Sequence, residues 1–342
     1  MIAVWKYSLE TEAQRLLHCA HQIVIGFYRV NNFIVLPYTP KAGNALIVTF
    51  PDLPYNTIPR FWDRVKKINV TDFPLQIKTD LLKQTTSLLK IANLPAMGFQ
   101  KTKKLWEKAQ DKILKEIYRI MPAKQGQIQK IIIHPTSFGT TCSFNLSKKS
   151  VDYVEMYLRQ DQGISTITEA ILSSLTRPGI YEKLDGVWQE SEIVTDWLMT
   201  ESSLAEIIKK YENKSNFVPT IKGTRSKQQA KLLAEFETFY QKLGLPINQK
   251  VFNLNGLTPE IYQKPVGNLS PTEKIVLKIL IEKANQPVSF DEIGDLFFRS
   301  EENFSLYAIT KTIQRLRNKL EENGLSGSYI QTMRGRGYVL KN

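Results

Sequence analysis

Residues 269–342 constrain the fold most, because they contain a motif that starts a helix at a defined residue. In Ser270-Pro271-Thr272-Glu273, the serine hydroxyl can accept a hydrogen bond from the Glu273 backbone amide, and the glutamate carboxylate can accept one from the serine amide. Pro271 suits the first helical position, where no amide hydrogen is needed. The sequence therefore predicts a helix that begins at Pro271.

Two further helices are predicted downstream. Ser289 caps the segment SFDEIGDLFF, whose first turn holds two acidic residues where the helix dipole favours negative charge. After a loop at 299–304, residues 305–323 carry apolar side chains at helical spacing, and Gly324 ends this third helix. The apolar stripe consists of Ile309, Ile313, Leu316 and Leu320.

A glycine-rich hairpin closes the segment. The runs YIQTM and YVLK flank Arg334-Gly335-Arg336-Gly337, whose glycines permit positive φ in a tight turn and whose arginines project from its tip. Three helices and a basic hairpin form the winged helix-turn-helix arrangement, in which helix 305–323 enters the major groove and the wing, 329–341, contacts the backbone or minor groove. Residues 305–342 carry seven basic and two acidic side chains, so the positive charge lies on the elements that would face DNA.

This segment resembles the OmpR/PhoB-type C-terminal effector domain of bacterial response regulators. The similarity is carried by LSPTE at 269–273, by IQRLRNKL at 313–320 and by YIQTMRGRGY at 329–338. The resemblance implies sequence-specific binding to double-stranded DNA. Family members often bind direct repeats as dimers, so a homodimer is also expected.

The resemblance further implies which side chains contact DNA. On the third helix and the wing they are Tyr307, Thr310, Lys311, Gln314, Arg315, Arg334 and Arg336. Arg317 is expected to contact a phosphate or an acidic side chain of the protein itself.

One residue departs from the family pattern: Gln314 stands where the family often has a basic residue. A glutamine amide can pair with adenine but cannot supply a positive charge to a phosphate, so the family's target sequence does not carry over. The loop 299–304 is a candidate contact for RNA polymerase, as the corresponding loop is in some family members. The fold could instead serve as a protein-interaction module, but the retained basic residues favour DNA.

The composition agrees with a cytoplasmic nucleic-acid-binding protein. A net charge of +13 favours a polyanionic partner, with nucleic acid ahead of an anionic membrane surface. The two cysteines, Cys19 and Cys142, cannot build a disulfide framework, which favours a reduced compartment. The opening residues lack the pattern of a signal peptide, and no apolar stretch is long enough to span a bilayer, so no membrane partner is expected.

The remaining sequence indicates an α+β, multidomain chain. Residues 1–125 are predicted to be mostly helical, 126–243 to form an α+β region, and the proline- and glycine-rich 244–268 to be a linker. Within 126–243 we expect strands at 126–135 and 150–160, a helix from about 165 to 176 that stops at Pro178-Gly179, and helices at 189–199 and 226–243. A phosphate-accepting receiver domain is not expected, since the opening MIAVWKYSLETEAQ has no acidic pair at a strand end.

Residues 126–200 also resemble gluzincin metallopeptidases, although more weakly. Those enzymes bind zinc through HExxH on one helix and a glutamate in an ExxxD pattern on a later helix. Here the first motif is Thr168-Glu169-Ala170-Ile171-Leu172 and the second is Glu192-Ile193-Val194-Thr195-Asp196. Thr168 and Leu172 replace both histidines, so the resemblance implies a degenerate zincin-like domain in which Glu169, Glu192 and Asp196 are remnants. Alternatively, acidic residues simply fall at these places on two ordinary helices.

No catalytic set, metal site or cofactor site is expected elsewhere, because the sequence has no GxGxxG after a strand, no GxxxxGK followed by serine or threonine, and no GxSxG. His18 and His21, three apart on a helix, lack a third ligand, and His134 is expected at a strand end. We therefore expect a sequence-specific transcriptional regulator that is not an enzyme, with an N-terminal domain that senses a signal or oligomerises. One alternative is a metallopeptidase-like hydrolase or pseudo-enzyme with a DNA-targeting domain. Another is a mobile-element protein that binds nucleic acid non-specifically through the basic segments 101–130 and 209–250.

Overall fold

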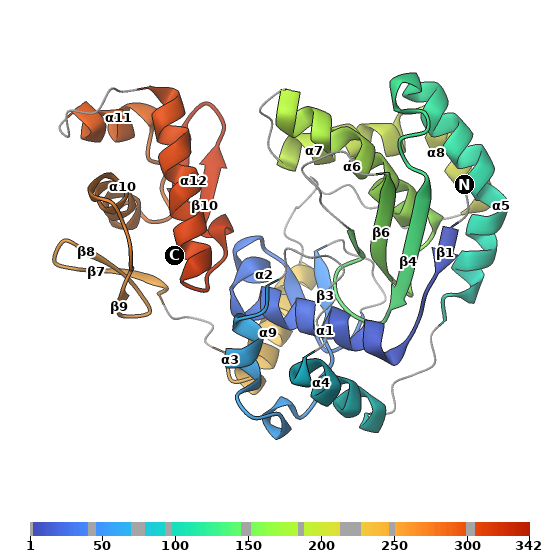
Figure 1. Cartoon of the computed structure of the whole chain (residues 1–342), viewed down its shortest axis with the longest axis horizontal. Coiled ribbons are helices and arrows are strands. Elements are labelled where there is room, and N and C mark those ends of the chain that lie inside the picture. Colours follow the sequence, from blue (N-terminus) through green and yellow to red (C-terminus); the bar gives the residue numbers. More distant parts are fainter. Residues whose placement is uncertain are drawn as a thin grey trace. The chain divides into compact units, whose positions relative to one another are not determined.

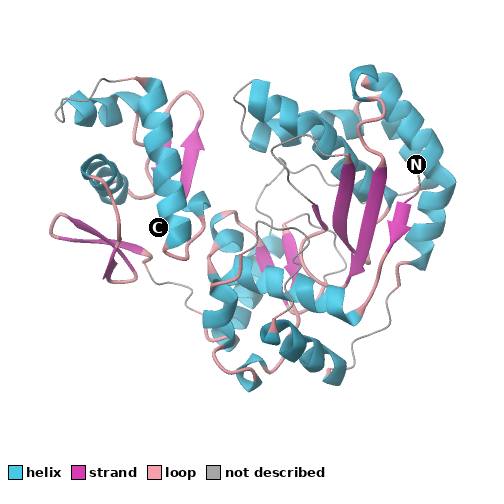
Figure 2. Ribbon diagram, in the orientation of Figure 1, coloured by secondary structure: helices cyan, strands magenta, loops and turns pink. Residues whose placement is uncertain are grey.

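The chain forms two compact units (Figure 1). Unit 1 comprises Met1–Ala20 and Ile34–Phe236, and unit 2 comprises His21–Phe33 and Glu237–Asn342. Both contain helices and strands (Figure 2), which confirms the expected mixture of the two. The structure is a computed structural model, and it describes residues 3–39, 46–69, 79–92, 98–144, 152–183, 188–212, 227–245, 250–298 and 305–342.

Unit 1 is built on a four-stranded sheet with the order β1-β4-β6-β5. Strands β1 (Ala3–Trp5), β4 (Lys130–Thr136) and β6 (Tyr153–Arg159) are parallel, and β5 (Cys142–Phe144) pairs with β6 as an antiparallel edge strand. Long apolar runs suit parallel strands that are covered on both faces. Because β1 pairs with β4, the expected boundary at residue 125 is wrong: it would divide a single sheet.

Helices surround this sheet (Figure 1). Those of unit 1 are α1 (Leu9–Val24, whose last residues belong to unit 2), α3 (Phe61–Lys66), α4 (Asp80–Ile91), α5 (Gln100–Ile120), α6 (Ile164–Lys183), α7 (Trp188–Thr200), α8 (Ser203–Tyr211) and most of α9 (Lys227–Lys242), with short 3-10 turns η1 (Tyr55–Thr57) and η2 (Pro122–Lys124). Along α5, Trp106, Ile113 and Ile117 are fully buried while most of its lysines face solvent, which is the amphipathic pattern of a helix on a core. Among the described helices, none is long and apolar enough to cross a membrane.

Helix α6 continues beyond the expected stop at residue 176 and passes through Pro178. A proline inside a helix removes one backbone hydrogen bond and crowds the preceding turn, so the sequence alone favoured an end there. Leu175 and Ile180, on either side of Pro178, are both buried. Tertiary packing therefore compensates for the local cost of the proline.

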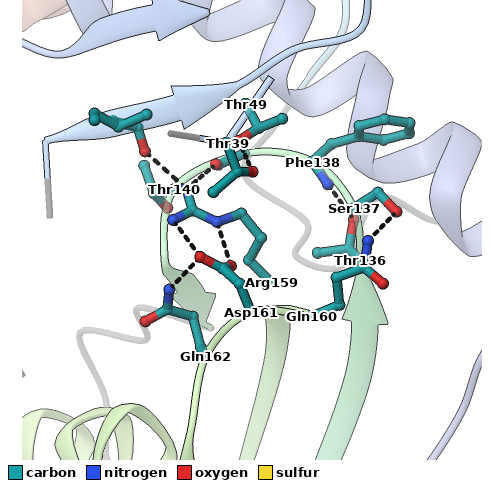
Figure 3. Close-up of polar contacts among 12 residues, drawn as sticks. Thr39, Thr49, Thr136, Ser137, Phe138, Thr140, Arg159, Gln160, Asp161 and Gln162 are labelled. Atoms are coloured by element: carbon teal, nitrogen blue, oxygen red, sulfur yellow. Dashed lines mark hydrogen bonds and ion pairs between the residues drawn. The ribbon is translucent and has the colours of Figure 1, made fainter. Parts of the chain in front are cut away.

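A buried arginine joins the main sheet to a second, two-stranded sheet (Figure 3). The second sheet pairs β2 (Ile34–Leu36) with β3 (Ile47–Thr49) in parallel. Arg159, at the end of β6, donates to both carboxylate oxygens of Asp161, at 2.6 and 3.1 Å, and to the carbonyls of Ile47 and Gly139, at 2.9 and 3.2 Å. A buried guanidinium that is paired and hydrogen-bonded in this way fixes the junction between the two sheets.

Unit 2 begins its sheet inside the expected linker. Strands β7 (Phe252–Asn255), β8 (Thr258–Ile261) and β9 (Lys264–Pro265) form a three-stranded antiparallel sheet. Phe252, Ile261 and Val266 are buried in the core of the unit. The prediction of a linker over 244–268 is therefore wrong for its described residues, because the glycine and proline there serve hairpin turns, as Gly256 does at φ 60°.

The three predicted helices of unit 2 follow as α10 (Pro271–Glu282), α11 (Phe290–Phe298) and α12 (Leu306–Glu322). The capping box at α10 is present, with Glu273 N donating to Ser270 Oγ at 3.2 Å and Ser270 N donating to Glu273 Oε2 at 2.8 Å. Ser289 and Glu292 form the same pair of bonds at α11. All four residues of the predicted α12 stripe are buried.

The wing follows α12 through the 3-10 turn η3 (Gly327–Tyr329) and pairs β10 (Ile330–Met333) with β11 (Gly337–Leu340). Val288 extends this hairpin, because it exchanges two backbone hydrogen bonds with Tyr338, at 2.7 and 2.9 Å. Gly337 lies beside this contact at φ 123°, and a Cβ atom there would overlap the Val288 carbonyl oxygen. Glycine is therefore needed at position 337 for two reasons: it permits the positive φ, and it leaves room for the Val288 carbonyl oxygen.

A segment distant in sequence completes unit 2. Helix α2 (Phe27–Val30) contributes Val30 to the core of the unit. Arg29 Nη2 donates to Tyr329 Oη at 2.8 Å, and Ser326 N donates to Ile25 O at 3.0 Å. Gly26, at φ 77°, lies under the same tyrosine hydroxyl, and a Cβ there would overlap it.

Gly337→Ala should destabilise unit 2 by about 2–3 kcal/mol, since it adds a steric overlap to an unfavourable φ. Gly335→Ala is the matched control: Gly335 also has positive φ, 67°, but a Cβ there would meet nothing within 4 Å. It should cost only about 1 kcal/mol. Calorimetry of the full chain, with hydrogen exchange of the wing amides, measures both. Equal losses for the two variants would contradict the steric argument.

Candidate nucleic-acid interface

The exposed face of α12 carries the side chains expected to contact DNA. Ser305 caps the helix by accepting from Ala308 N at 3.1 Å. Because the apolar stripe is buried, the opposite side of the helix faces solvent. The exposed residues there are Tyr307, Thr310, Lys311, Gln314 and Arg315.

Contacts within the helix orient two of these side chains. Lys311 Nζ lies 5.2 Å from the centroid of the Tyr307 ring, a cation–π arrangement. Gln314 Nε2 donates to Asn318 Oδ1 at 3.1 Å. That bond leaves Gln314 its amide oxygen and one further N–H, which is the donor and acceptor pair that adenine accepts in the major groove.

Arg315 is oriented by Glu273, the glutamate of the capping box at the start of α10. Its Nε lies 3.5 Å from Glu273 Oε1, and its Nη2 donates to Thr312 Oγ1 at 3.2 Å. Glu273 thus uses one carboxylate oxygen for the Ser270 amide and the other for Arg315. The Arg315 side chain is still 62% exposed, so it remains accessible from solvent. The capping box therefore also positions a basic side chain on the exposed face.

The wing presents two more basic side chains, and Arg317 is placed differently. Arg334 and Arg336 are both exposed, and Arg336 N closes the turn by donating to Met333 O at 2.8 Å. Arg317 instead donates to Ile330 O at 3.0 Å and to Thr332 Oγ1 at 2.9 Å, and burial lowers its pKa. The expectation that Arg317 contacts a phosphate or an internal acid is therefore corrected: it ties α12 to β10 through a carbonyl and a hydroxyl.

The charge along α12 is arranged unevenly. Its two acidic residues, Glu321 and Glu322, lie in the last turn, away from Lys311 and Arg315. The N-terminal end of a helix also carries partial positive charge, which attracts phosphate groups. The loop 299–304, considered as a contact for RNA polymerase, lies outside the described residues.

The residues on which the weaker resemblance to peptidases depends lie on two packed helices of unit 1. Thr168 and Leu172 are fully buried on α6, and Thr168 Oγ1 donates to Ile164 O of its own helix at 2.8 Å. Glu192 and Asp196 lie on α7. Across the described residues, no group of three or more His, Cys, Asp and Glu side chains is arranged to hold a metal ion.

The three acidic residues nonetheless act on one another electrostatically. Burial, followed by the negative charges of Glu192 and Asp196, raises the pKa of Glu169 to about 8. Arg177 on α6 donates to Glu192 Oε1 at 2.9 Å and lies over the ring of Phe144 on β5. The sequence spacing therefore identified acidic residues that share one environment, but the partner Arg177 was missed.

Comparison with known proteins concerns the C-terminal segment. Residues 263–340 match the family described as "Transcriptional regulatory protein, C terminal". The resemblance of this segment to OmpR/PhoB-type effector domains is confirmed. The match begins before Leu269, the first residue quoted for the resemblance, and includes strand β9.

Two curated relatives are similar over this segment. "Response regulator protein GraR" of Staphylococcus aureus (strain MRSA252) is 45% identical over 71 residues, which cover 21% of this chain and 31% of the relative. "Sensory transduction protein BceR" of Halalkalibacterium halodurans is 40% identical over 73 residues, with the same coverage. The chain thus spans about a third of the length of the relatives that it matches.

Among solved structures, the C-terminal domain of the nisin resistance regulator NsrR, a lantibiotic response regulator, is 29% identical. The match covers 28% of this chain and 95% of that chain, with a TM-score of 0.23.

Two features of the interface were missed by the sequence analysis. The exposed Leu306 was not singled out, because it lies three and seven residues before Ile309 and Ile313 and so is in register with the apolar stripe by spacing alone. The contact of Arg29 with Tyr329 has no sequence signal, because the two residues are about 300 positions apart.

The raised pKa of the Glu169 carboxyl predicts a pH dependence of stability. Its pKa of about 8 in the folded chain lies above the ordinary 4.5, so the folded chain binds more protons between these values. Stability should therefore fall as pH rises from about 5 to 8, by at most about 1.4 kcal/mol per pH unit. Glu169→Gln should flatten this decline and stabilise unit 1 at pH 8.

All five tryptophans lie in unit 1, so urea unfolding followed by tryptophan fluorescence measures this unit selectively. Glu206→Gln, at an exposed position on α8, is the control and should keep the wild-type difference between pH 5.5 and 8. A decline of equal size in Glu169→Gln would show that Glu169 is not its source.

Proposed function

We propose that this protein is a sequence-specific, DNA-binding transcriptional regulator. Helix α12 enters the major groove, and the wing 329–341 contacts the backbone or minor groove. The observation that carries the proposal is the exposed face of α12, which displays Lys311, Gln314 and Arg315 opposite the buried apolar stripe. This helix lies within the segment that matches the family of transcriptional regulatory C-terminal domains.

Different side chains of this surface have different roles. Lys311 and Arg315 supply positive charge near base edges and phosphates, Gln314 supplies an amide for a base edge, and Arg334 and Arg336 approach DNA from the wing. Tyr307 and Thr310 border the same face. Arg317 acts indirectly, because its bonds to β10 set the position of the wing relative to α12.

The rest of the chain supplies control in this proposal. Unit 1 senses a signal or oligomerises, the regulator acts in the cytoplasm as a homodimer, and the loop 299–304 contacts RNA polymerase. The names of both curated relatives describe regulatory or sensory functions, but those relatives match this chain only over its C-terminal segment.

Selection of bound sequences from a random DNA pool tests the proposal. At near-physiological salt, the wild type should enrich a defined motif, and Arg334→Ala/Arg336→Ala should bind it more weakly, with a salt slope reduced by roughly two. The matched control is Lys278→Ala/Lys319→Ala, which removes the same charge from side chains paired with Glu282 and Glu322. It should bind nearly as the wild type does.

Equal, weak and sequence-independent binding by all three proteins would reject this function. Such a result would favour non-specific binding through the basic segments 101–130 and 209–250. Weakening by both double variants to the same extent would mean that total charge, and not the wing, determines affinity.

We also propose that residues 126–200 form a degenerate, zincin-like region that does not hold a catalytic zinc. The proposal is supported by the element order, in which an antiparallel edge strand β5 and strand β6 precede α6 and α7. It is further supported by the electrostatic coupling of Glu169 to Glu192 and Asp196. Thr168 and Leu172 do not fit zinc, so these residues support no hydrolytic step.

Restoring both histidine positions tests the second proposal. After dialysis with zinc and then metal-free buffer, Thr168→His/Leu172→His should retain about one zinc per chain, while the wild type retains far less. Adding Glu192→Gln should reduce retention, since it removes the third ligand. A double variant with native circular dichroism that retains no zinc would contradict a zincin-like geometry. One zinc per wild-type chain would instead favour an active hydrolase.

A further inference from the structure

Two apolar side chains at the start of α12 are more exposed than a folded domain requires. Leu306 is 61% exposed and Tyr307 is 70% exposed, and they are the first two residues of the helix. The buried stripe of α12 begins only at Ile309, so the first turn projects beyond the core. Single exposed apolar side chains are common, but adjacent ones at one helix end form a patch of the kind that marks interaction sites.

Neighbouring side chains make this end of the helix apolar in character. Thr310 lies one turn after Leu306, and its hydroxyl donates to the Leu306 carbonyl at 2.9 Å. Its proton is therefore used within the helix, and the methyl group of Thr310 remains for outside contacts. Lys311 lies over the Tyr307 ring and holds the aromatic side chain against the helix. We call Leu306, Tyr307 and Thr310 the apolar edge of α12.

The surroundings of the apolar edge favour duplex DNA over a protein surface. Lys311 lies one turn after Tyr307 on the exposed side of the helix, and both acidic residues of α12 lie in its last turn. An apolar edge beside a cationic side chain at a helix N-terminus is complementary to a groove lined by phosphates. The inference rests on the proposed function, which already places this helix in the major groove.

Only one base presents an apolar group in the major groove. Thymine carries its C5-methyl group there, whereas the other bases present hydrogen-bond donors and acceptors. We propose that the apolar edge of α12 contacts thymine methyl groups, and that Leu306 and Tyr307 thereby determine specificity. The bound sequence then contains thymines at the positions nearest the N-terminus of α12.

Removal of single methyl groups from the DNA tests this directly. Each thymine of the sequence selected by the wild type is replaced in turn by deoxyuridine, and the dissociation constant is measured at fixed salt. Loss of a contacted methyl should weaken wild-type binding roughly fourfold. If Leu306 or Tyr307 contacts a given thymine methyl, replacing that residue by alanine should abolish the effect of removing the methyl. Leu306→Ala and Tyr307→Ala should therefore each have, at one thymine position, nearly the same affinity for the thymine duplex and the uracil duplex, as a double-mutant cycle predicts for residues in contact.

Leu257→Ala is the matched control, because Leu257 is 67% exposed in the same unit but lies at the turn between β7 and β8. It should keep the wild-type ratio of thymine to uracil affinity. Equal wild-type affinity for every uracil duplex, or an unchanged ratio in both α12 variants, would overturn the inference while leaving sequence-specific binding intact. Absence of any selected sequence would overturn the proposed function and this inference together. Loss of self-association in Leu306→Ala, with an unchanged ratio, would assign the apolar edge to a protein interface and also overturn it.

Discussion

The rotation of α12 about its own axis decides which of its side chains face solvent and which face the core. Four buried residues, Ile309, Ile313, Leu316 and Leu320, fix that rotation by packing into the core of unit 2. Arg317 adds a polar constraint, because its two bonds to β10 join the helix to the wing. The exposed face follows from these contacts, since side chains on the other side of a well-packed helix cannot turn inward without unpacking the core.

The effector segment depends on residues from the beginning of the chain. Val30 is part of its core, and Arg29 is bonded to Tyr329 at the base of the wing. Gly26 permits this approach, because it has positive φ and no side chain under the tyrosine hydroxyl. The compact unit is therefore larger than the matched segment 263–340, and a change near residue 26 would act at the turn that leads into the wing.

Unit 1 retains a costly arrangement of charges. Glu169 is half-buried near two other carboxylates, and its raised pKa expresses the unfavourable free energy of ionising it there. Arg177 offsets part of this cost through its ion pair with Glu192. Carboxylates with shifted pKa values of this kind arise both at functional sites and in structural ion-pair networks.

The sequence by itself determined the winged helix-turn-helix, because its signals are local. A capping box, a helical apolar stripe and two glycines at a turn each specify the conformation of a few neighbouring residues. The same locality explains why the sequence alone could place Lys311, Gln314 and Arg315 on an exposed face. Tertiary structure alone decided the pairing of β1 with β4, the β7–β9 sheet in an expected linker, the continuation of α6 through Pro178, and the inward placement of Arg317. Each of these features is stabilised by packing or hydrogen bonds with residues outside the local segment. A local pattern of side chains does not specify which other part of the chain a segment will pack against.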